Sequence, residues 1–178
     1  MTIVITREFF FDGEAARIVQ LLSSNMANLV HIRKPQATKD EVETLIRQLP
    51  SEFYHQLVLH DHHSLAIKYG LRGIHLNHRN PHPPDGWKGS ISISCHSISE
   101  LAQCRLQPFD YLSLSPIFDS ISKQGYRSAF TASELAEAHR LGIIDQRVMA
   151  LGGVTFSKIH QVLGMGFGGA MILGDAWK

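Results

Sequence analysis

Cysteine is nearly absent from this 178-residue sequence, which contains only Cys95 and Cys104. They do not form a Cys-x-x-Cys pair, so we expect neither a disulfide framework nor a structural zinc knuckle. Long hydrophobic runs are also missing, because none approaches the roughly 20 residues of a membrane-spanning helix. The first residues, Met1 to Thr6, lack the basic region and cleavage site of a signal peptide and have the pattern of a strand. We therefore expect a cytoplasmic protein.

An excess of either charge is missing too, since 17 Lys and Arg residues balance 16 Asp and Glu residues, for a net charge of +1. This balance provides no basic face for nucleic acid, so we expect neither nucleic acid nor a membrane as a partner. With 44% hydrophobic residues, the chain has enough apolar material for one sizeable core. We predict a single domain covering residues 1–178.

What the sequence does contain is a regular alternation of short strand-like runs and amphipathic helical segments. Strands are predicted at Thr2 to Thr6, Asn28 to Arg33, Gln56 to His60, Gly73 to Leu76, Ser90 to Ser94, Tyr111 to Ser115, Arg147 to Leu151 and Gly169 to Leu173. Helices are predicted at Gly13 to Ser23, Thr38 to Gln48, His63 to Tyr69, Ser97 to Gln103, Ala132 to Leu141 and Phe156 to Leu163, with caps at Asp12, Thr38, Ser97, Thr131 and Thr155.

Repeated βα units specify parallel strands with right-handed crossovers, and eight strands predict a closed TIM (β/α)₈ barrel. The segment from Asn77 to Gly86 is too rich in proline for a full fourth helix, and the chain stops at Lys178, soon after the eighth strand. We therefore expect a compact barrel with a short or missing fourth helix and a truncated C-terminal helix. A partner subunit in a homo-oligomer is one way to cover its open side. An open doubly wound sheet is the alternative.

The carboxyl ends of the predicted strands carry polar residues, and a barrel places its active site at these ends. The sixth strand runs into a turn with Ser120, Ser122 and Lys123, whose hydroxyls and ammonium are typical of a phosphate site. The other candidate ligand-binding residues are His31, Arg33, Lys34, His60, Asp61, Asn80, Ser94, Gly153 and Gly174. Cations and hydroxyls outnumber acids in this set, so we predict an anionic ligand.

Eleven histidines leave a metal site open as an alternative. Residues two apart in an extended chain point to the same face, so His60 and His62 are able to chelate one ion, with His75 or His78 completing a zinc-type site. A metal-activated hydrolase would follow from that arrangement, but it leaves the phosphate-type groups after the second and sixth strands unexplained.

The ordered motifs resemble the thiamin-phosphate synthase and thiazole tautomerase superfamily of small (β/α)₈ barrels, over almost the whole chain. Five segments carry the resemblance: Val30-His-Ile-Arg33, Gly73-Ile-His-Leu76, Ser94-Cys-His-Ser97, Asp110 to Lys123 with its Ser-Pro-Ile-Phe core, and Ala150-Leu-Gly-Gly-Val154. His60-Asp61-His62 stands where the family has Asn-Asp-Arg.

The resemblance implies an enzyme that joins a hydroxymethylpyrimidine diphosphate to a thiazole phosphate, releasing diphosphate and forming thiamin phosphate. It implies that Arg33, Lys123 and Ser94 hold the diphosphate and that Asp61 binds Mg²⁺. It also implies that Ser120, Ser122 and the Gly153 amide bind the thiazole phosphate, with the turn at Gly174 assisting. The small phosphorylated pyrimidine and thiazole are thus the implied partners.

Several positions depart from the synthase pattern. Asn80 stands at the second Mg²⁺-binding aspartate and is a weaker ligand. His60 replaces an asparagine that would contact diphosphate, and Pro35 replaces a lysine for which Lys34 is the nearest substitute. His31-Ile-Arg33 is similar to the tautomerase branch, whereas Pro116 is the synthase residue. Three hypotheses stay open: a synthase, a tautomerase-like isomerase with His96 or His31 as base, and a barrel that only binds thiazole or thiamin phosphate.

Overall fold

The computed structural model describes residues 1–119 and 128–178 and contains a closed barrel of parallel strands in the order β1 to β8. The strands are β1 (Thr2–Ile5), β2 (Leu29–Ile32), β3 (Leu57–Leu59), β4 (Gly73–Leu76), β5 (Ser90–Cys95), β6 (Tyr111–Leu114), β7 (Val148–Leu151) and β8 (Gly169–Ile172). The predicted TIM barrel is therefore confirmed, and each of the eight predicted strands overlaps one of these. The chain consists of two compact units.

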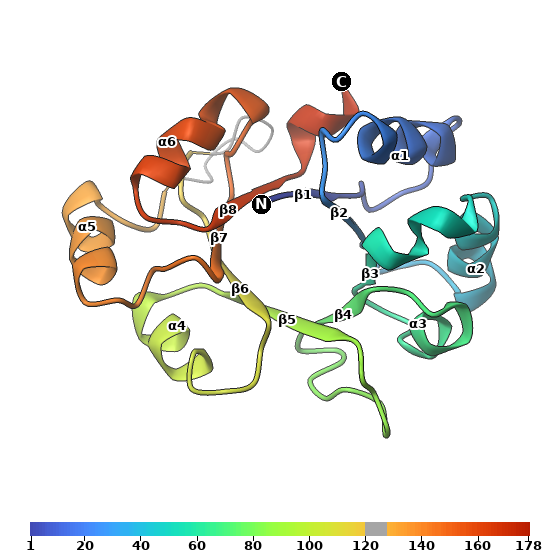
Figure 1. Cartoon of the computed structure of the whole chain (residues 1–178), viewed down its shortest axis with the longest axis horizontal. Coiled ribbons are helices and arrows are strands. Elements are labelled where there is room, and N and C mark those ends of the chain that lie inside the picture. The colour runs from blue at the N-terminus through green and yellow to red at the C-terminus, as the bar shows by residue number, and fades with distance from the viewer. Residues whose placement is uncertain (120–127) are drawn as a thin grey trace. The chain divides into compact units, whose positions relative to one another are not determined.

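The N-terminal unit, Ile3–Ile91, contains β1 to β4 and the helices α1 (Glu14–Ser23), α2 (Lys39–Arg47) and α3 (Ser64–Tyr69), which lie along one side of these strands (Figure 1). A 3-10 helix, η1 (Ser51–Gln56), leads into β3. Ile5 pairs with His31, and His31 pairs with Val58. Every residue of β2 and β4 is buried, as expected for parallel strands that are covered on both faces. Polar residues within them are therefore informative.

The C-terminal unit consists of Met1–Thr2 and Ser92–Lys178. Its helices are α4 (Ile98–Cys104), α5 (Ala132–Arg140) and α6 (Ile159–Gly164), with the 3-10 helices η2 (Phe156–Lys158) and η3 (Gly174–Trp177). Ser94 pairs with Ser113 across β5 and β6, and Leu151 pairs with Met171 across β7 and β8. The N-terminal ammonium of Met1 donates to the Gly168 carbonyl at 2.8 Å.

Local capping chemistry explains where the helices α2, α4 and α5 begin. Thr38 and Thr131 each form a capping box with a glutamate three residues later, and the Ser97 hydroxyl accepts from the Glu100 amide. Two predicted caps are wrong. Helix α1 is preceded by Gly13 with a left-handed backbone rather than capped by Asp12, and Thr155 makes no side-chain cap and precedes a 3-10 turn.

The predicted irregularities are confirmed. No helix lies between β4 and β5, a stretch described in full, and the chain ends in the short η3 instead of an eighth helix. Within residues 1–119 and 128–178, no helix has the length and apolar content to cross a membrane. The single-domain organisation stays a prediction.

Candidate functional site

Three buried histidines meet in the N-terminal unit. His31 lies in β2, His60 directly follows β3, and His75 lies in β4, with exposed fractions of 0%, 6% and 3%. His31 Nδ1 and His60 Nε2 are 2.9 Å apart, close enough for one ring to donate to the other. The rings of His60 and His75 stack with centroids 4.2 Å apart. We call His31, His60 and His75 the imidazole cluster.

Burial keeps the imidazole cluster neutral. It lowers the pKa of His31 and His60 well below the usual value and brings the pKa of His75 down to about 3, because a charged ring loses its hydration there. The neighbouring histidines lower these pKa values further, since two positive rings repel each other. At neutral pH the cluster therefore offers hydrogen-bond donors and acceptors but no charge.

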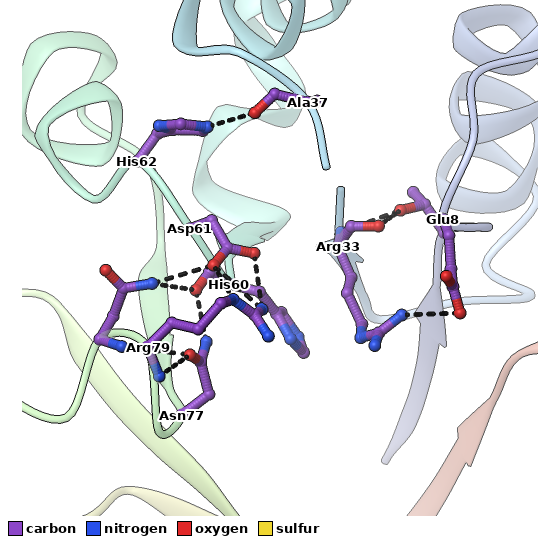
Figure 2. A network of polar contacts seen from close by, with 10 residues as sticks. Glu8, Arg33, Ala37, His60, Asp61, His62, Asn77 and Arg79 are labelled. Carbon is purple, nitrogen blue, oxygen red and sulfur yellow. Dashed lines mark hydrogen bonds and ion pairs between the residues drawn. The ribbon is translucent and has the colours of Figure 1, made fainter. Parts of the chain in front are cut away.

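Next to the cluster, Asp61 is the centre of a polar network (Figure 2). Arg79 donates to both carboxylate oxygens of Asp61, from Nε and Nη2, each at 3.1 Å. Asn80 donates from Nδ2 to Asp61 Oδ1 at 2.9 Å. Asn77 organises the turn, because its Oδ1 accepts from the amides of Arg79 and Asn80 while its Nδ2 donates to the His60 carbonyl at 2.7 Å.

The two predicted Mg²⁺ ligands, Asp61 and Asn80, are thus side by side, but they do not form a suitable magnesium site. Mg²⁺ binds oxygen ligands, whereas Asn80 turns its amide nitrogen toward Asp61. Both oxygens of the one carboxylate already accept from the Arg79 guanidinium, which occupies the side where a cation would bind. The pairing of Arg79 with Asp61 was not predicted from the sequence.

Arg33 follows β2 and keeps a partly exposed guanidinium, with 33% of its side chain accessible. Its Nη1 lies 3.5 Å from Glu8 Oε1 (Figure 2). The Arg33 amide donates to the Thr6 hydroxyl at 2.9 Å, which fixes the backbone at the end of the strand. A guanidinium held in this way remains available to a phosphate, because a single exposed contact to Glu8 is weak.

Lys34, the neighbouring cation, has a different environment from the one predicted. Its side chain is 0% exposed, and its ammonium donates to both oxygens of Glu14 at 2.7 and 2.8 Å and to the Phe9 carbonyl at 3.0 Å. The ring of Phe10 lies 4.4 Å from the same ammonium. These contacts use all three donors of Lys34 within the protein. The structure therefore gives no support to its predicted role in binding diphosphate.

The alternative zinc site built on His60 and His62 is not formed. His62 has a left-handed backbone, with φ of 54°, and its Nε2 lies 2.8 Å from the Ala37 carbonyl (Figure 2). Because β3 ends at Leu59, the chain is no longer extended at these two histidines, and the alternation of side chains does not apply. His31, which was not part of that hypothesis, lies beside His60 and His75 instead.

In the C-terminal unit, hydroxyls and one imidazole gather at the ends of β5 and β6. The Ser113 hydroxyl donates to the Ser94 hydroxyl at 2.9 Å. Beyond the strands, Ser115 Oγ lies 3.2 Å from Nδ1 of the exposed His96. Ser94 was predicted as a ligand for diphosphate, whereas the pairing of His96 with Ser115 was not foreseen. It brings a potential base next to a hydroxyl.

The turn after β7 packs tightly on the segment after β6. A Cβ atom on Gly153 would lie 2.4 Å from the Asp119 carbonyl oxygen, and its φ of 63° is in the left-handed region. Lys158 donates to the Gly153 carbonyl at 3.1 Å, and its ammonium lies 4.4 Å from the Phe118 ring centroid. Lys158 thus places a cation beside Gly153 and Phe118, and it was not predicted as a site residue. Gly174 is the exposed first residue of η3.

Three predicted residues, Ser120, Ser122 and Lys123, lie outside the described residues. The ends of this segment are described. The amide of Ser128 donates to Asp119 Oδ1 at 2.7 Å, and its hydroxyl donates to the Ile117 carbonyl at 2.9 Å.

Comparison with known sequences relates the chain to one family. The family model described as thiamine monophosphate synthase matches residues 2–174. The thiamine-phosphate synthase of Listeria monocytogenes serotype 4b (strain F2365) is 28% identical over 141 residues, which are 76% of this chain and 65% of the relative. The thiamine-phosphate synthase of Halalkalibacterium halodurans is 24% identical over 168 residues, covering 89% of this chain and 78% of that one. The chain thus spans slightly less than two thirds of the Listeria relative.

Solved structures give the same relationship. The crystal structure of thiamine phosphate pyrophosphorylase from Bacteroides thetaiotaomicron superimposes with a TM-score of 0.86 at 38% identity, covering 99% of this chain and 84% of that one. The thiamine phosphate pyrophosphorylase from Pyrococcus furiosus has a TM-score of 0.71 at 20% identity, covering 98% of this chain and 89% of that one. The second similarity supports the fold alone.

Proposed function

Because the chain belongs to the thiamine monophosphate synthase family, we propose that it joins a hydroxymethylpyrimidine diphosphate to a thiazole phosphate, forming thiamin phosphate and releasing diphosphate. The observation that carries this proposal is a pair of guanidiniums, Arg33 after β2 and Arg79 after β4, with side chains 33% and 35% exposed. Both act electrostatically on His60, so they lie near one point of the N-terminal unit. Two guanidiniums beside a neutral polar cluster suit a diphosphate attached to an uncharged ring.

The proposed chemistry is mainly electrostatic. Arg33 and Arg79 stabilise the negative charge that builds up on the departing diphosphate. The imidazole cluster is neutral, so it is able to hydrogen bond to the pyrimidine without repelling the cation that forms as the diphosphate leaves. The thiazole nitrogen then attacks this cation. By resemblance, Ser94 and Lys123 assist with the diphosphate, while Ser120, Ser122, Gly153 and Gly174 hold the thiazole phosphate.

Mg²⁺ is a general requirement in this family, but we assign no step to an ion on Asp61 and Asn80. The Arg79 guanidinium already neutralises Asp61, and Asn80 presents a donor where a ligand oxygen is needed. Any Mg²⁺ that supports the reaction then enters with the diphosphate, whose oxygens are good ligands for it.

A tautomerase-like isomerase is the second candidate, and the contact between His96 and Ser115 favours it. Moving a double bond in a thiazole carboxylate phosphate needs a base that takes a proton from one carbon and an acid that returns one to another. His96 is exposed and its Nδ1 lies 3.2 Å from the Ser115 hydroxyl, so a basic nitrogen and a hydroxyl are adjacent there.

One set of assays separates these functions. The protein is incubated with the pyrimidine diphosphate and thiazole phosphate, with and without Mg²⁺, and thiamin phosphate is measured. We expect product that is lost in Arg33→Ala and weakened in Lys123→Ala, with Arg47→Ala as a control on the remote helix α2. Absence of product at high enzyme concentration contradicts the synthase. Aromatisation of the unsaturated thiazole tautomer, lost in His96→Asn, would then support the isomerase.

If thiazole phosphate raises the temperature of thermal unfolding but neither reaction is observed, the hypothesis of a barrel that only binds thiazole or thiamin phosphate is supported.

A further inference from the structure

We propose that His31, His60 and His75 form a binding site for a divalent transition-metal ion of the Zn²⁺ class. The site is the same cluster that the proposed function places beside the pyrimidine, and ion binding is measured without either substrate, so the two proposals can fail separately. One ring nitrogen from each residue lies within 4.8 Å of the other two. The rings come from or directly after three neighbouring strands, β2, β3 and β4, so the fold itself brings them together. Three imidazole ligands leave the fourth position of a tetrahedral zinc site open to water or a ligand.

The burial of the imidazole cluster limits which partners its ring nitrogens have. All three rings are buried, and those of His60 and His75 stack with centroids 4.2 Å apart. Burial removes these rings from water, so any partner for their nitrogens comes from the protein or from a bound ligand. The mutual contact of His31 and His60 satisfies one donor and one acceptor. A metal ion accepts one lone pair from each of the three rings at once.

The protonation state also suits metal binding. Metals bind the deprotonated nitrogen of histidine, so protons compete with the metal only below the pKa of the ring. Burial depresses the pKa of all three rings, and that of His75 falls to about 3. The direction of these shifts agrees with the geometry, because a neutral ring keeps a nitrogen lone pair that is able to bind an ion.

The geometry requires only modest rearrangement. With Zn–N distances of about 2.0–2.1 Å, the ligand nitrogens of a tetrahedral site stand roughly 3.3 Å apart. His31 Nδ1 and His60 Nε2, now 2.9 Å apart, must separate slightly, while the remaining nitrogens within 4.8 Å draw closer. His63, itself buried, lies close enough to His75 to help lower the pKa of that ring.

The nearby charges do not prevent a cation from binding. Arg33 and Arg79 oppose positive charge at His60, which is visible in their effect on its pKa. Each guanidinium is paired with a carboxylate, Arg33 with Glu8 and Arg79 with Asp61, so their repulsion is reduced. The Asp61 carboxylate is occupied by Arg79, which leaves the imidazoles as the ligands we assign to the ion.

The test uses the full chain without a histidine tag. The protein is stripped with a chelator and titrated with Zn²⁺ in competition with a chromophoric chelator, at neutral pH and in mild acid. We expect about one tightly bound Zn²⁺ per chain, a higher temperature of thermal unfolding, and a Co²⁺ complex with the intense visible absorption of tetrahedral coordination. A weak octahedral Co²⁺ spectrum, or no binding beyond the competitor, would overturn the proposal without any variant.

Variants then identify the ligands. His31→Asn, His60→Asn and His75→Asn should each weaken Zn²⁺ binding by more than the 10–100-fold that is typical for loss of an outer-sphere partner. His62→Asn is the matched control, because His62 lies two residues from His60 but contacts Ala37 instead, and it should bind as the wild type does. Asp61→Asn should also retain Zn²⁺. Loss of binding in Asp61→Asn with retention in His31→Asn would assign the ion to another site and reject the three-histidine cluster.

Discussion

The Arg79 guanidinium lies across the Asp61 carboxylate, with Nε and Nη2 each 3.1 Å from a different oxygen. This two-point contact places a fixed positive charge where the resemblance implies Mg²⁺. Asn80 reinforces it by donating to the same carboxylate at 2.9 Å. The Arg79 guanidinium, a cation of the protein itself, thus occupies the ion-binding end of this network.

Asn80→Asp should raise the affinity for Mg²⁺ on the order of tenfold, because a second carboxylate replaces an amide donor next to Asp61. Isothermal titration calorimetry measures the affinity, and the rate of thiamin phosphate formation should become more dependent on Mg²⁺. Asn77→Asp adds the same charge in the same turn but does not contact Asp61, so it serves as the control. Equal effects of the two variants would mean that added charge alone attracts the ion.

Lys34→Met should lower the free energy of unfolding by about 3–5 kcal/mol, because it leaves Glu14 buried without its partner. Burial already raises the pKa of Glu14 and lowers that of Lys34, so each charge depends on the other. Urea unfolding measures the loss, and the double variant Lys34→Met with Glu14→Leu should recover most of it. Lys68→Met, which breaks an exposed pair with Glu43, should change stability far less.

If Lys34→Met instead leaves stability unchanged and weakens only diphosphate binding, the ammonium is a ligand and the buried pair is not structural.

Stability should fall as the pH drops below about 6.5, the usual pKa of histidine. Below this pH the histidines of the unfolded chain bind protons, whereas those of the folded imidazole cluster do not. The reason is that burial lowers the pKa of the folded rings, to about 3 for His75. Each such ring contributes up to about 1.4 kcal/mol per pH unit in this window. Urea unfolding of the metal-free protein from pH 6.5 to 5 should give a shallower slope for His75→Asn than for the wild type. Identical slopes would show that His75 titrates equally in both states.

Gly153→Ala should destabilise the protein more than Gly142→Ala. Both glycines have left-handed backbones, with φ of 63° and 70°, so each substitution carries a similar backbone cost of about 1–2 kcal/mol. Only at Gly153 does a Cβ meet other atoms, the Asp119 carbonyl oxygen at 2.4 Å, whereas nothing lies within 4 Å at Gly142. Urea unfolding compares the two. Equal losses would mean that the backbone conformation, and not the packing against the segment after β6, requires glycine.

Local features of the sequence were sufficient for the order of the elements. The caps at Thr38, Ser97 and Thr131 depend on a hydrogen bond to an amide three residues away, a distance that the sequence displays directly. Proline between Asn77 and Gly86 excludes a helix for an equally local reason. Family resemblance was confirmed because it rests on many short motifs in a set order, each of which survives substitutions elsewhere.

Pairings between distant residues were not predictable in this way. From the sequence alone, Lys34 is expected to be a solvated or ligand-binding cation. The fold instead places Glu14, 20 residues earlier in the chain, against its ammonium. The sequence places Arg79 in a loop but does not show that its guanidinium pairs with the carboxylate of Asp61, 18 residues earlier. The predicted direction of the His62 side chain was wrong because β3 ends at Leu59, one residue before the predicted end of the strand at His60.

The barrel, its missing fourth helix and the family could be inferred from the sequence, because strand patterns, caps and proline act over a few neighbouring residues. Which side chains meet follows from the three-dimensional fold. His31 and His60, 29 residues apart, come within 2.9 Å because β2 and β3 pair in one register, and a shift of one residue would turn His31 to the other face. The sequence therefore shows which residue types are present near the site, whereas the distances between their side chains depend on strand register.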